Sequence, residues 1–228
     1  MTLRLGAVLF DLDGTLVDSA PDLAGACNEM RAERGLAPLP YERLRRMVGS
    51  GARGMVGVAF GLVPDSPGYL ELRDEFLARY EARMTRETKV FDDMVPVLAW
   101  LEREGLPWGI VTNKATRFAV PLVAALGLAE RAAVLVCGDT VAHSKPHPAP
   151  LLEAARRLRL APQKCAYVGD DRRDVDAGRA AGMPTIVAAW GYLGEGDAPK
   201  AWGADRLIGR PDELPALIGG ALKAGSLP

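Results

Sequence analysis

The sequence contains little of what marks a membrane, nucleic-acid-binding or secreted protein. Its 228 residues carry a formal net charge of −1, so no basic field favours a nucleic acid or an anionic membrane surface. No apolar run approaches the roughly 20 residues that span a bilayer, and the N-terminus lacks a signal-peptide pattern. The three cysteines, Cys27, Cys137 and Cys165, are scattered without metal-ligand spacing. We therefore predict a cytoplasmic protein that binds neither nucleic acid nor membrane.

Six short apolar runs predict the strands of one sheet. They are apolar throughout instead of alternating, which is typical of parallel strands covered on both faces. Helical patterns separate them, as in the run 94–101, whose apolar residues follow the spacing of one helix face. We predict an α/β fold with a Rossmann-like, doubly wound parallel sheet. The expected strands are residues 7–10, 109–112, 134–137, 165–168, 185–189 and 206–208.

The segment between the first two predicted strands breaks this alternation. Residues 19–87 contain no convincing strand, and their helical patterns follow one another directly. Such a segment is too long for a simple crossover between neighbouring strands. We predict an all-helical cap domain at 18–86, inserted into an α/β core made of residues 1–17 and 87–228.

Polar side chains gather where the predicted strands end. In an open parallel sheet this edge is where ligands bind. The groups include carboxylates, a hydroxyl, an amide and an ammonium, which together suit the hydrolysis of a phosphate monoester. In chain order they are Asp11 and Asp13, then Thr112, Asn113 and Lys114, then Ser144 and Lys145, then Asp170, Asp171 and Asp174.

Each group taken alone has an ordinary structural explanation. An aspartate after a strand is commonly a turn residue or a helix cap, and acids also favour the start of a helix. Lys145 alone would be a solvated surface lysine. The pattern DLDG (11–14) is also typical of a calcium loop, but Ser19 and Asp22 do not supply the later ligands. The joint occurrence of the groups in this order favours a catalytic site.

These motifs resemble those of the haloacid dehalogenase superfamily. DLDGTLV (11–17) is similar to its first motif, VTN (111–113) to its second, SKP (144–146) to its third and GDDRRD (169–174) to its fourth. The resemblance covers nearly the whole chain, and the helical insert has the position of the type 1 cap. One departure is Asp171, where the family often has a small residue.

The resemblance implies a magnesium-dependent phosphatase. Asp11 would attack phosphorus and form an aspartyl-phosphate, while Asp13 would protonate the leaving oxygen and then deprotonate the attacking water. Mg²⁺ would be bound by Asp11, by the backbone carbonyl of Asp13 and by Asp170.

The remaining motif residues would hold the phosphate or support the metal. Thr112, Asn113 and Lys145 would bind the non-bridging phosphoryl oxygens. Asp174 would support the metal or Lys145 without being a direct ligand, and Asp171 would do the same. A dehalogenase would leave Asp13 without a task, because carbon–halogen displacement needs no proton donor. A phosphomutase and a non-catalytic interaction protein stay open as alternatives.

Substrate choice is expected to lie in the cap. Residues 49–54 read as a flexible polar segment between helices, where Arg53 would contact a substrate carboxylate or would be an ordinary surface arginine. The expected partner is a small phosphorylated metabolite that carries a carboxylate. The sequence does not determine the oligomeric state.

Within the superfamily the chain is most similar to the phosphoglycolate phosphatase group, which makes 2-phosphoglycolate the first expected substrate. A sister group that hydrolyses N-acetylmuramic acid 6-phosphate provides the alternative. The two esters differ greatly in size, so a tight pocket would favour the first and a broad cleft the second. Residues 18–23, 106–114 and 145–148 carry the first likeness, and residues 30–35, 133–137 and 202–205 the second.

Overall fold

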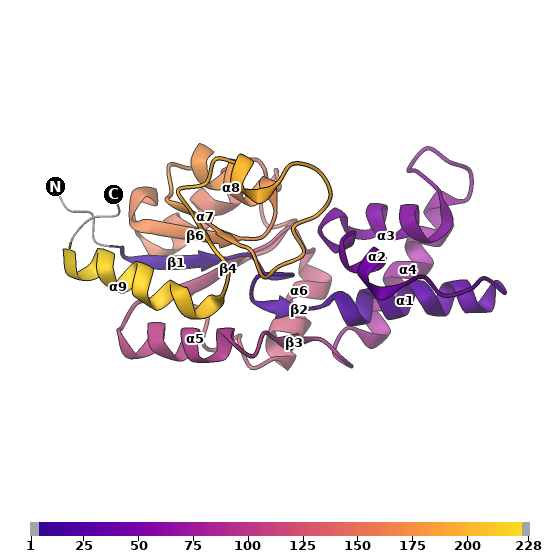
Figure 1. Ribbon diagram of the computed structural model, residues 1–228, viewed down its shortest axis with the longest axis horizontal. Helices are drawn as coiled ribbons and strands as arrows, with labels where there is room; N and C mark the ends of the chain where they lie inside the picture. The colour runs from indigo at the N-terminus through magenta and orange to yellow at the C-terminus, as the bar shows by residue number, and fades with distance from the viewer. Residues whose placement is uncertain (1–4, 225–228) are drawn as a thin grey trace.

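The structure, a computed structural model, describes residues 5–224 and consists of a sheet-containing part beside a helical part (Figure 1). The sheet has six parallel strands in the order β5-β4-β1-β6-β7-β8. The chain builds outward from β1 on one side and then crosses back to build the other side. This topology confirms the predicted α/β class with a doubly wound parallel sheet.

All six predicted runs form strands of this sheet, with small differences at their ends. The sequence located β1 and β8 to the residue, whereas β5 is shorter than expected because only two of its residues pair with β4 at the sheet edge. The strands are β1 (Ala7–Phe10), β4 (Trp108–Val111), β5 (Leu135–Val136), β6 (Cys165–Gly169), β7 (Thr185–Ala188) and β8 (Arg206–Ile208).

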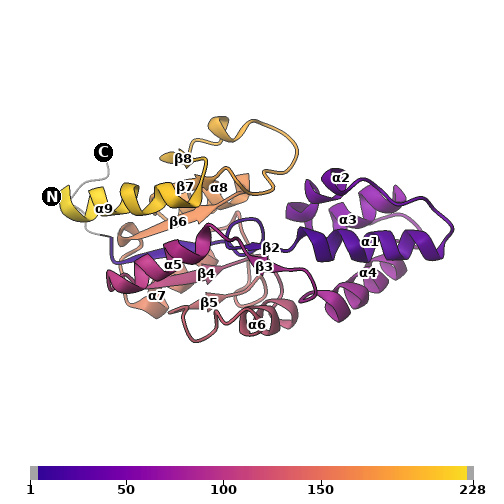
Figure 2. The same ribbon diagram turned by 60° about the horizontal axis from the view of Figure 1, so that its bottom comes forward.

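Helices cover both faces of the sheet, which explains why its strands are apolar throughout. Val8 and Phe10 of β1 belong to the apolar cluster of one face, and Ala7 and Leu9 to that of the other. Figure 2 shows the helices on either side. The first face packs against α5 (Met94–Arg103), α6 (Thr116–Ala125) and α9 (Leu214–Ala224), and the second against α7 (Ala149–Leu158) and α8 (Arg172–Ala180).

The inserted segment folds as helices with an apolar cluster of their own. Leu23, Cys27 and Met30 of α1 pack with Phe76 and Tyr80 of α4, as the helical spacing predicts. The domain boundaries at residues 18 and 86 stay a prediction, and residues 1–4 and 225–228 of the expected core lie outside the described residues. The helices are α1 (Ala20–Glu33), α2 (Tyr41–Arg45), α3 (Gly51–Phe60) and α4 (Tyr69–Arg83).

Two very short strands connect the helical part to the sheet. β2 (Val17–Asp18) and β3 (Lys89–Val90) pair antiparallel. Strands of two residues carry no periodicity, so the sequence gives no signal for them. Buried Asp22 accepts hydrogen bonds from the backbone N–H groups of Glu87 (3.0 Å) and Thr88 (2.9 Å), which ties the return connection to the start of α1.

The glycine-rich segment 49–54 is not the flexible connection that the sequence suggested. It continues a short 3-10 helix, Val48–Ser50, directly into the first turn of α3. Gly54 and Met55 are buried there, so packing against the other cap helices outweighs the low helix propensity of glycine. No helix among residues 5–224 is both long and apolar enough to cross a membrane.

Candidate active site

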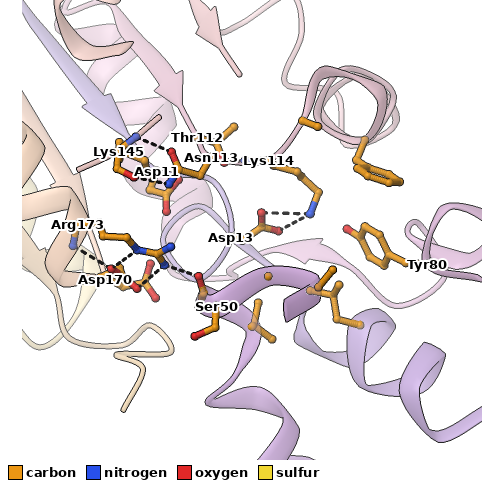
Figure 3. Close-up of a pocket in the computed structure, with 18 of the residues that line it drawn as sticks. Asp11, Asp13, Ser50, Tyr80, Thr112, Asn113, Lys114, Lys145, Asp170 and Arg173 are labelled. Carbon is orange, nitrogen blue, oxygen red and sulfur yellow. Dashed lines mark hydrogen bonds and ion pairs between the residues drawn. The ribbon is translucent and has the colours of Figure 1, made fainter. Parts of the chain in front are cut away.

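The four motifs meet at the carboxyl edge of the sheet, in a pocket of about 410 Å³ that the helical part covers (Figure 3). From the core come Asp11, Asp13, Thr112, Asn113, Lys114, Lys145, Asp170, Asp171, Arg173 and Asp174. From the cap come residues 48–52 together with the apolar or aromatic side chains of Leu23, Phe76, Leu77 and Tyr80. The pocket therefore has a charged floor and a largely apolar wall.

Asp11 and Lys145 form the centre of the charged floor. The Lys145 ammonium lies 2.9 Å from Oδ1 of Asp11 and 2.7 Å from Oδ1 of Asp174, and it also donates to the hydroxyl of Tyr167 at 2.8 Å. Burial raises the pKa of Asp11 to about 7, with Asp174 adding to the rise and Lys145 opposing it. Lys145 is also buried, but the two carboxylates raise its pKa and keep it charged.

Three carboxylates lie close enough together to bind a cation. One oxygen from each of Asp11, Asp170 and Asp174 lies within 4.8 Å of the others. Asp170 is only 4% exposed, and burial, followed by the charges of Asp11 and Asp174, raises its pKa well above the usual value. Lys145 alone does not balance three acids, so a hard divalent cation fits this cluster.

Gly14 leaves room for the Asp170 carboxylate, and two hydrogen bonds orient it. Gly14 has a φ of +85°, and a Cβ there would overlap the Asp170 carboxylate. Oδ1 of Asp170 accepts a hydrogen bond from the Thr15 hydroxyl (2.8 Å), and Oδ2 accepts one from the backbone N–H of Tyr192 (2.7 Å). The glycine of the first motif thus lets the turn after β1 approach Asp170 of the fourth motif closely.

Asp174 and Asp171 play different supporting parts at the start of α8. Besides its ion pair with Lys145, Asp174 accepts a hydrogen bond from the backbone N–H of Asp171 (3.0 Å), so both of its oxygens are engaged. Asp171 caps α8 and forms an ion pair with Arg173 (2.7 Å). Burial would raise the pKa of Asp171, but Arg173 outweighs it and lowers the pKa. Asp174 supports Lys145, and Asp171 faces an arginine.

Asp13 has surroundings quite unlike those of Asp11. Its two oxygens lie 3.0 and 3.2 Å from the Lys114 ammonium, and Oδ1 accepts a hydrogen bond from the Ser19 hydroxyl (2.5 Å). Burial opposes the charge of Lys114, yet the charge of Asp13 outweighs it and raises the lysine pKa. The two acids of the first motif are therefore held by two different lysines.

Thr112 and Asn113, which the sequence predicts to bind phosphate, both line the pocket, but their side chains form different hydrogen bonds. The Thr112 hydroxyl accepts a hydrogen bond from the backbone N–H of Lys114 (3.1 Å) and keeps its own proton to donate. The Asn113 amide pairs with the backbone of Lys145 through two hydrogen bonds of 2.9 Å. The Asn113 side chain thus positions the Lys145 loop, whose Lys145–Pro146 peptide bond is cis.

The structure does not bring Arg53 to the pocket. Ser50, Gly51 and Ala52 line it, but Arg53 is exposed and does not. The physical reason is that α3 begins at Gly51, so the side chain of Arg53 is rotated by about 100° about the helix axis from that of Ala52, which lines the pocket. A flexible loop, as the sequence suggested, would not have imposed this direction.

Several functional candidates were missed at the sequence level. Lys114 stands directly after the second motif, which was the available signal. Arg173 is part of the fourth motif and donates from the core to the backbone carbonyl of Gly49 in the cap. Tyr80 was predicted only as part of a buried helix face, and nothing in its spacing reveals that it also lines the pocket.

Comparison with known proteins agrees with this geometry. Residues 8–188 match the family model described as haloacid dehalogenase-like hydrolase. The chain belongs to that family. The match runs from β1 to the end of β7 and so includes all four motifs and the helical insert.

Named relatives of this family member are phosphatases with two different substrates. It is 47% identical over 220 residues to an N-acetylmuramic acid 6-phosphate phosphatase of Pseudomonas aeruginosa, covering 96% of this chain and 97% of the relative. It is 49% identical over 208 residues to a phosphoglycolate phosphatase of Xanthomonas campestris pv. campestris, covering 91% and 94%. These relatives confirm the predicted enzyme class, a phosphoric monoester hydrolase.

Solved structures have the same fold. A crystal structure of a predicted phosphoglycolate phosphatase from Haemophilus somnus superposes with a TM-score of 0.81 at 24% identity and covers 93% of this chain and 97% of its own. CbbY from Rhodobacter sphaeroides, solved in complex with phosphate, has a TM-score of 0.72 at 25% identity, covering 92% and 96%. The helical insert is therefore part of a shared architecture.

Proposed function

We propose that this phosphatase hydrolyses a small phosphate monoester whose leaving group carries a carboxylate, with 2-phosphoglycolate as the first candidate. The observation that carries the proposal is the separation of the two acids of the first motif. Asp11 lies with Lys145 and the acidic cluster, whereas Asp13 lies apart with Lys114. A nucleophile and a proton donor need such different surroundings.

The reaction proceeds in two displacements at phosphorus. Asp11 attacks, its oxygen–phosphorus bond forms, and the ester oxygen–phosphorus bond breaks while Asp13 gives its proton to the leaving oxygen. Water then attacks the aspartyl-phosphate, Asp13 takes a proton from it, and Asp11 is released with inorganic phosphate. Ser19 and Lys114 hold Asp13 in place for both proton transfers.

Asp11, Asp170 and the backbone carbonyl of Asp13 would hold Mg²⁺, which lowers the repulsion between Asp11 and an anionic substrate. Asp170 is oriented for this by its bonds from Thr15 and from the backbone of Tyr192. The charge of the acidic cluster supports a divalent cation better than a monovalent one.

The groups that receive the phosphoryl oxygens are Lys145 and Thr112. Lys145 is fixed by Asp174 and by the Asn113 amide, so it needs little reorganisation when charge develops on phosphorus. The free proton of the Thr112 hydroxyl supplies a second donor. Asp171 holds Arg173, which donates to the backbone carbonyl of Gly49 and so joins the core to the cap.

The position of Lys114 favours a carboxylate near the leaving oxygen. This lysine lies beside Asp13, on the side where the leaving group must be, and it is the cation that a short substituent on that group would meet first. In 2-phosphoglycolate the carboxylate is on the carbon next to the ester oxygen, within such reach. The charge of Lys114 and its contact with Asp13 support this ester.

N-acetylmuramic acid 6-phosphate is a second candidate, favoured by the size and wall of the pocket. A volume of about 410 Å³ is within the range of sites for drug-sized ligands, and a two-carbon ester fills only a part of it. The apolar wall of Leu23, Phe76, Leu77 and Phe118 would suit the face of a sugar ring. The name of the Pseudomonas aeruginosa relative points to the same ester.

Steady-state kinetics on the two esters with Mg²⁺ test the proposal. We expect the kcat/KM of the wild type to be higher for 2-phosphoglycolate, and a hundredfold preference either way, about 2.7 kcal/mol of transition-state discrimination, decides between the candidates. Chelation of the metal should abolish both activities. Hydrolysis of neither ester, by a preparation that turns over phenyl phosphate, would contradict the proposed substrate class.

A further inference from the structure

The hydroxyl of Tyr80 is the polar group in the pocket wall that the mechanism leaves unexplained. Tyr80 belongs to α4, is 2% exposed and lines the pocket. Among the residues that the structure describes, no group accepts a hydrogen bond from this hydroxyl, and the neighbouring Lys114 ammonium can only donate. Burying a hydroxyl whose proton has no acceptor costs free energy relative to leaving it in water, so such a group calls for an explanation.

This hydroxyl faces the leaving-group side of the site. Figure 3 shows Tyr80 with its oxygen turned toward Lys114 and Asp13. The Lys114 ammonium lies 4.6 Å from the centre of the Tyr80 ring, a cation–π contact that holds the two side chains together. Tyr80 comes from the cap and Lys114 from the core, so the pair spans the two parts of the pocket.

We propose that Tyr80 and Lys114 together bind the carboxylate of the substrate's leaving group and so determine specificity for a carboxylated ester. The inference rests on the proposed function and adds the residues that recognise the carboxylate. In the structure Lys114 pairs with Asp13, and no group among residues 5–224 accepts a hydrogen bond from the Tyr80 hydroxyl. On binding, the substrate carboxylate shares Lys114 with Asp13 and accepts a hydrogen bond from the Tyr80 hydroxyl.

The chemistry of the pair selects an anion that only accepts hydrogen bonds. An ammonium has donors and no acceptor, and a carboxylate has acceptors and no donor. Burial raises the pKa of the Tyr80 hydroxyl, which therefore stays protonated and able to donate. The phosphoryl group is excluded as the occupant because Lys145 and Thr112 stand on the side of Asp11, away from Lys114.

Tyr80→Phe tests the inference, since it removes the hydroxyl and keeps the ring over Lys114. The matched substrates are 2-phosphoglycolate and ethyl phosphate, which has a methyl group in place of the carboxylate. We expect Tyr80→Phe to lower kcat/KM for 2-phosphoglycolate about tenfold or more, because a hydrogen bond to a charged group is lost. For ethyl phosphate kcat/KM should change by less than about twofold, since that ester makes no such bond.

A control variant is available in the same helix. Tyr69 is a buried tyrosine of α4 that does not line the pocket, so Tyr69→Phe should leave the ratio of the two kcat/KM values unchanged. The melting temperature of Tyr80→Phe should be equal to or higher than that of the wild type, because no group among the described residues accepts a hydrogen bond from the lost hydroxyl. A clear fall would show a structural partner and overturn the inference.

The outcomes for the inference and for the proposed function are separate. Equal loss on both esters, or no loss on either, would overturn the role of Tyr80. A wild type that turns over ethyl phosphate as efficiently as 2-phosphoglycolate would contradict the proposed carboxylate specificity itself. A wild type that prefers 2-phosphoglycolate, with a Tyr80→Phe variant that keeps the full preference, would overturn the inference alone.

Discussion

The backbone N–H of Tyr192 donates a 2.7 Å hydrogen bond to Oδ2 of Asp170, so a residue just after strand β7 orients the candidate metal ligand. The hydroxyl of the same tyrosine accepts hydrogen bonds from the backbone N–H groups of Ser19 (2.8 Å) and Ala20 (3.0 Å), where α1 begins. Above its ring lies the guanidinium of Arg45, at 4.9 Å. Tyr192 therefore connects the acidic cluster to the first turn of the cap.

Tyr192→Phe should separate these two connections. The variant keeps the backbone bond to Asp170 but leaves the N–H groups of Ser19 and Ala20 without their acceptor. We expect a loss of about 1–3 kcal/mol in the free energy of unfolding, and a lower kcat because the cap is held less firmly. The Mg²⁺ concentration for half-maximal activity should stay within about twofold, because the bond to the ligand is retained.

Chemical denaturation and a Mg²⁺ titration of activity measure both effects. Tyr41→Phe, in the exposed part of α2, is the control and should change neither. A Tyr192→Phe variant with normal stability and kcat but a strongly raised Mg²⁺ requirement would contradict this division of tasks.

Asp22 and Arg83 form a buried ion pair that should be a main source of cap stability. Asp22 is fully buried and lies 3.3 Å from the Arg83 guanidinium, and its Oδ2 accepts three bonds from Glu87 and Thr88. In Asp22→Ala the Arg83 guanidinium keeps Glu29 and Glu87, but the three donors of Glu87 and Thr88 lose their buried acceptor. We expect the free energy of unfolding, measured by urea titration, to fall by about 2–4 kcal/mol.

An exposed pair provides the comparison for this prediction. Arg73 and Asp74 lie 2.6 Å apart with half or more of the Asp74 side chain in solvent. Asp74→Ala should lower the free energy of unfolding, measured by urea titration, by about 0–1 kcal/mol. Equal losses for Asp22→Ala and Asp74→Ala would mean that the buried pair does not stabilise the junction between cap and core.

The raised pKa of Asp11 predicts how stability depends on pH when the metal is chelated. A carboxyl with a pKa of about 7 in the folded chain and about 4 in the unfolded chain binds more protons when folded. Its contribution to the free energy of unfolding is therefore full below pH 4 and is lost as the pH rises through 7. Mg²⁺ should restore the most stability above pH 7, where it no longer competes with protons.

Urea denaturation in EDTA across this range measures the slope. Asp11→Asn cannot titrate, so its stability should decline less between pH 4 and 7 than that of the wild type. Identical slopes for the two proteins would show that Asp11 has an ordinary pKa in the folded chain.

The sequence was sufficient for those features that depend on short, rigid segments. Each strand of the sheet is an apolar run, and the residues that follow it reach the same sheet edge whatever the loops do, so Asp11, Lys145 and Asp170 could be brought together in advance. The direction of a cap side chain depends on where a helix begins and on how it packs. For this reason the sequence predicted Arg53 as the substrate-binding residue of the cap, whereas in the structure Tyr80 lines the pocket.

The role of Asn113 shows a second limit of the sequence. Its position in the second motif predicts a phosphate ligand, but its amide forms two hydrogen bonds with the backbone of Lys145, a residue distant in the chain. Only tertiary structure reveals such a pairing. The same holds for the contact of Arg173 with the cap.

The central claim, that Asp11 is the nucleophile and Asp13 the acid and base, is tested most directly by trapping the aspartyl-phosphate in Asp13→Asn. With p-nitrophenyl phosphate the leaving group needs no proton, so the first step proceeds, whereas hydrolysis lacks its base and slows. We predict a burst of about one p-nitrophenolate per protein and a phosphoryl group on the peptide that contains Asp11, both lost in the Asp11→Asn, Asp13→Asn double variant. Steady turnover without a burst, or a phosphoryl group on another residue, would contradict the account.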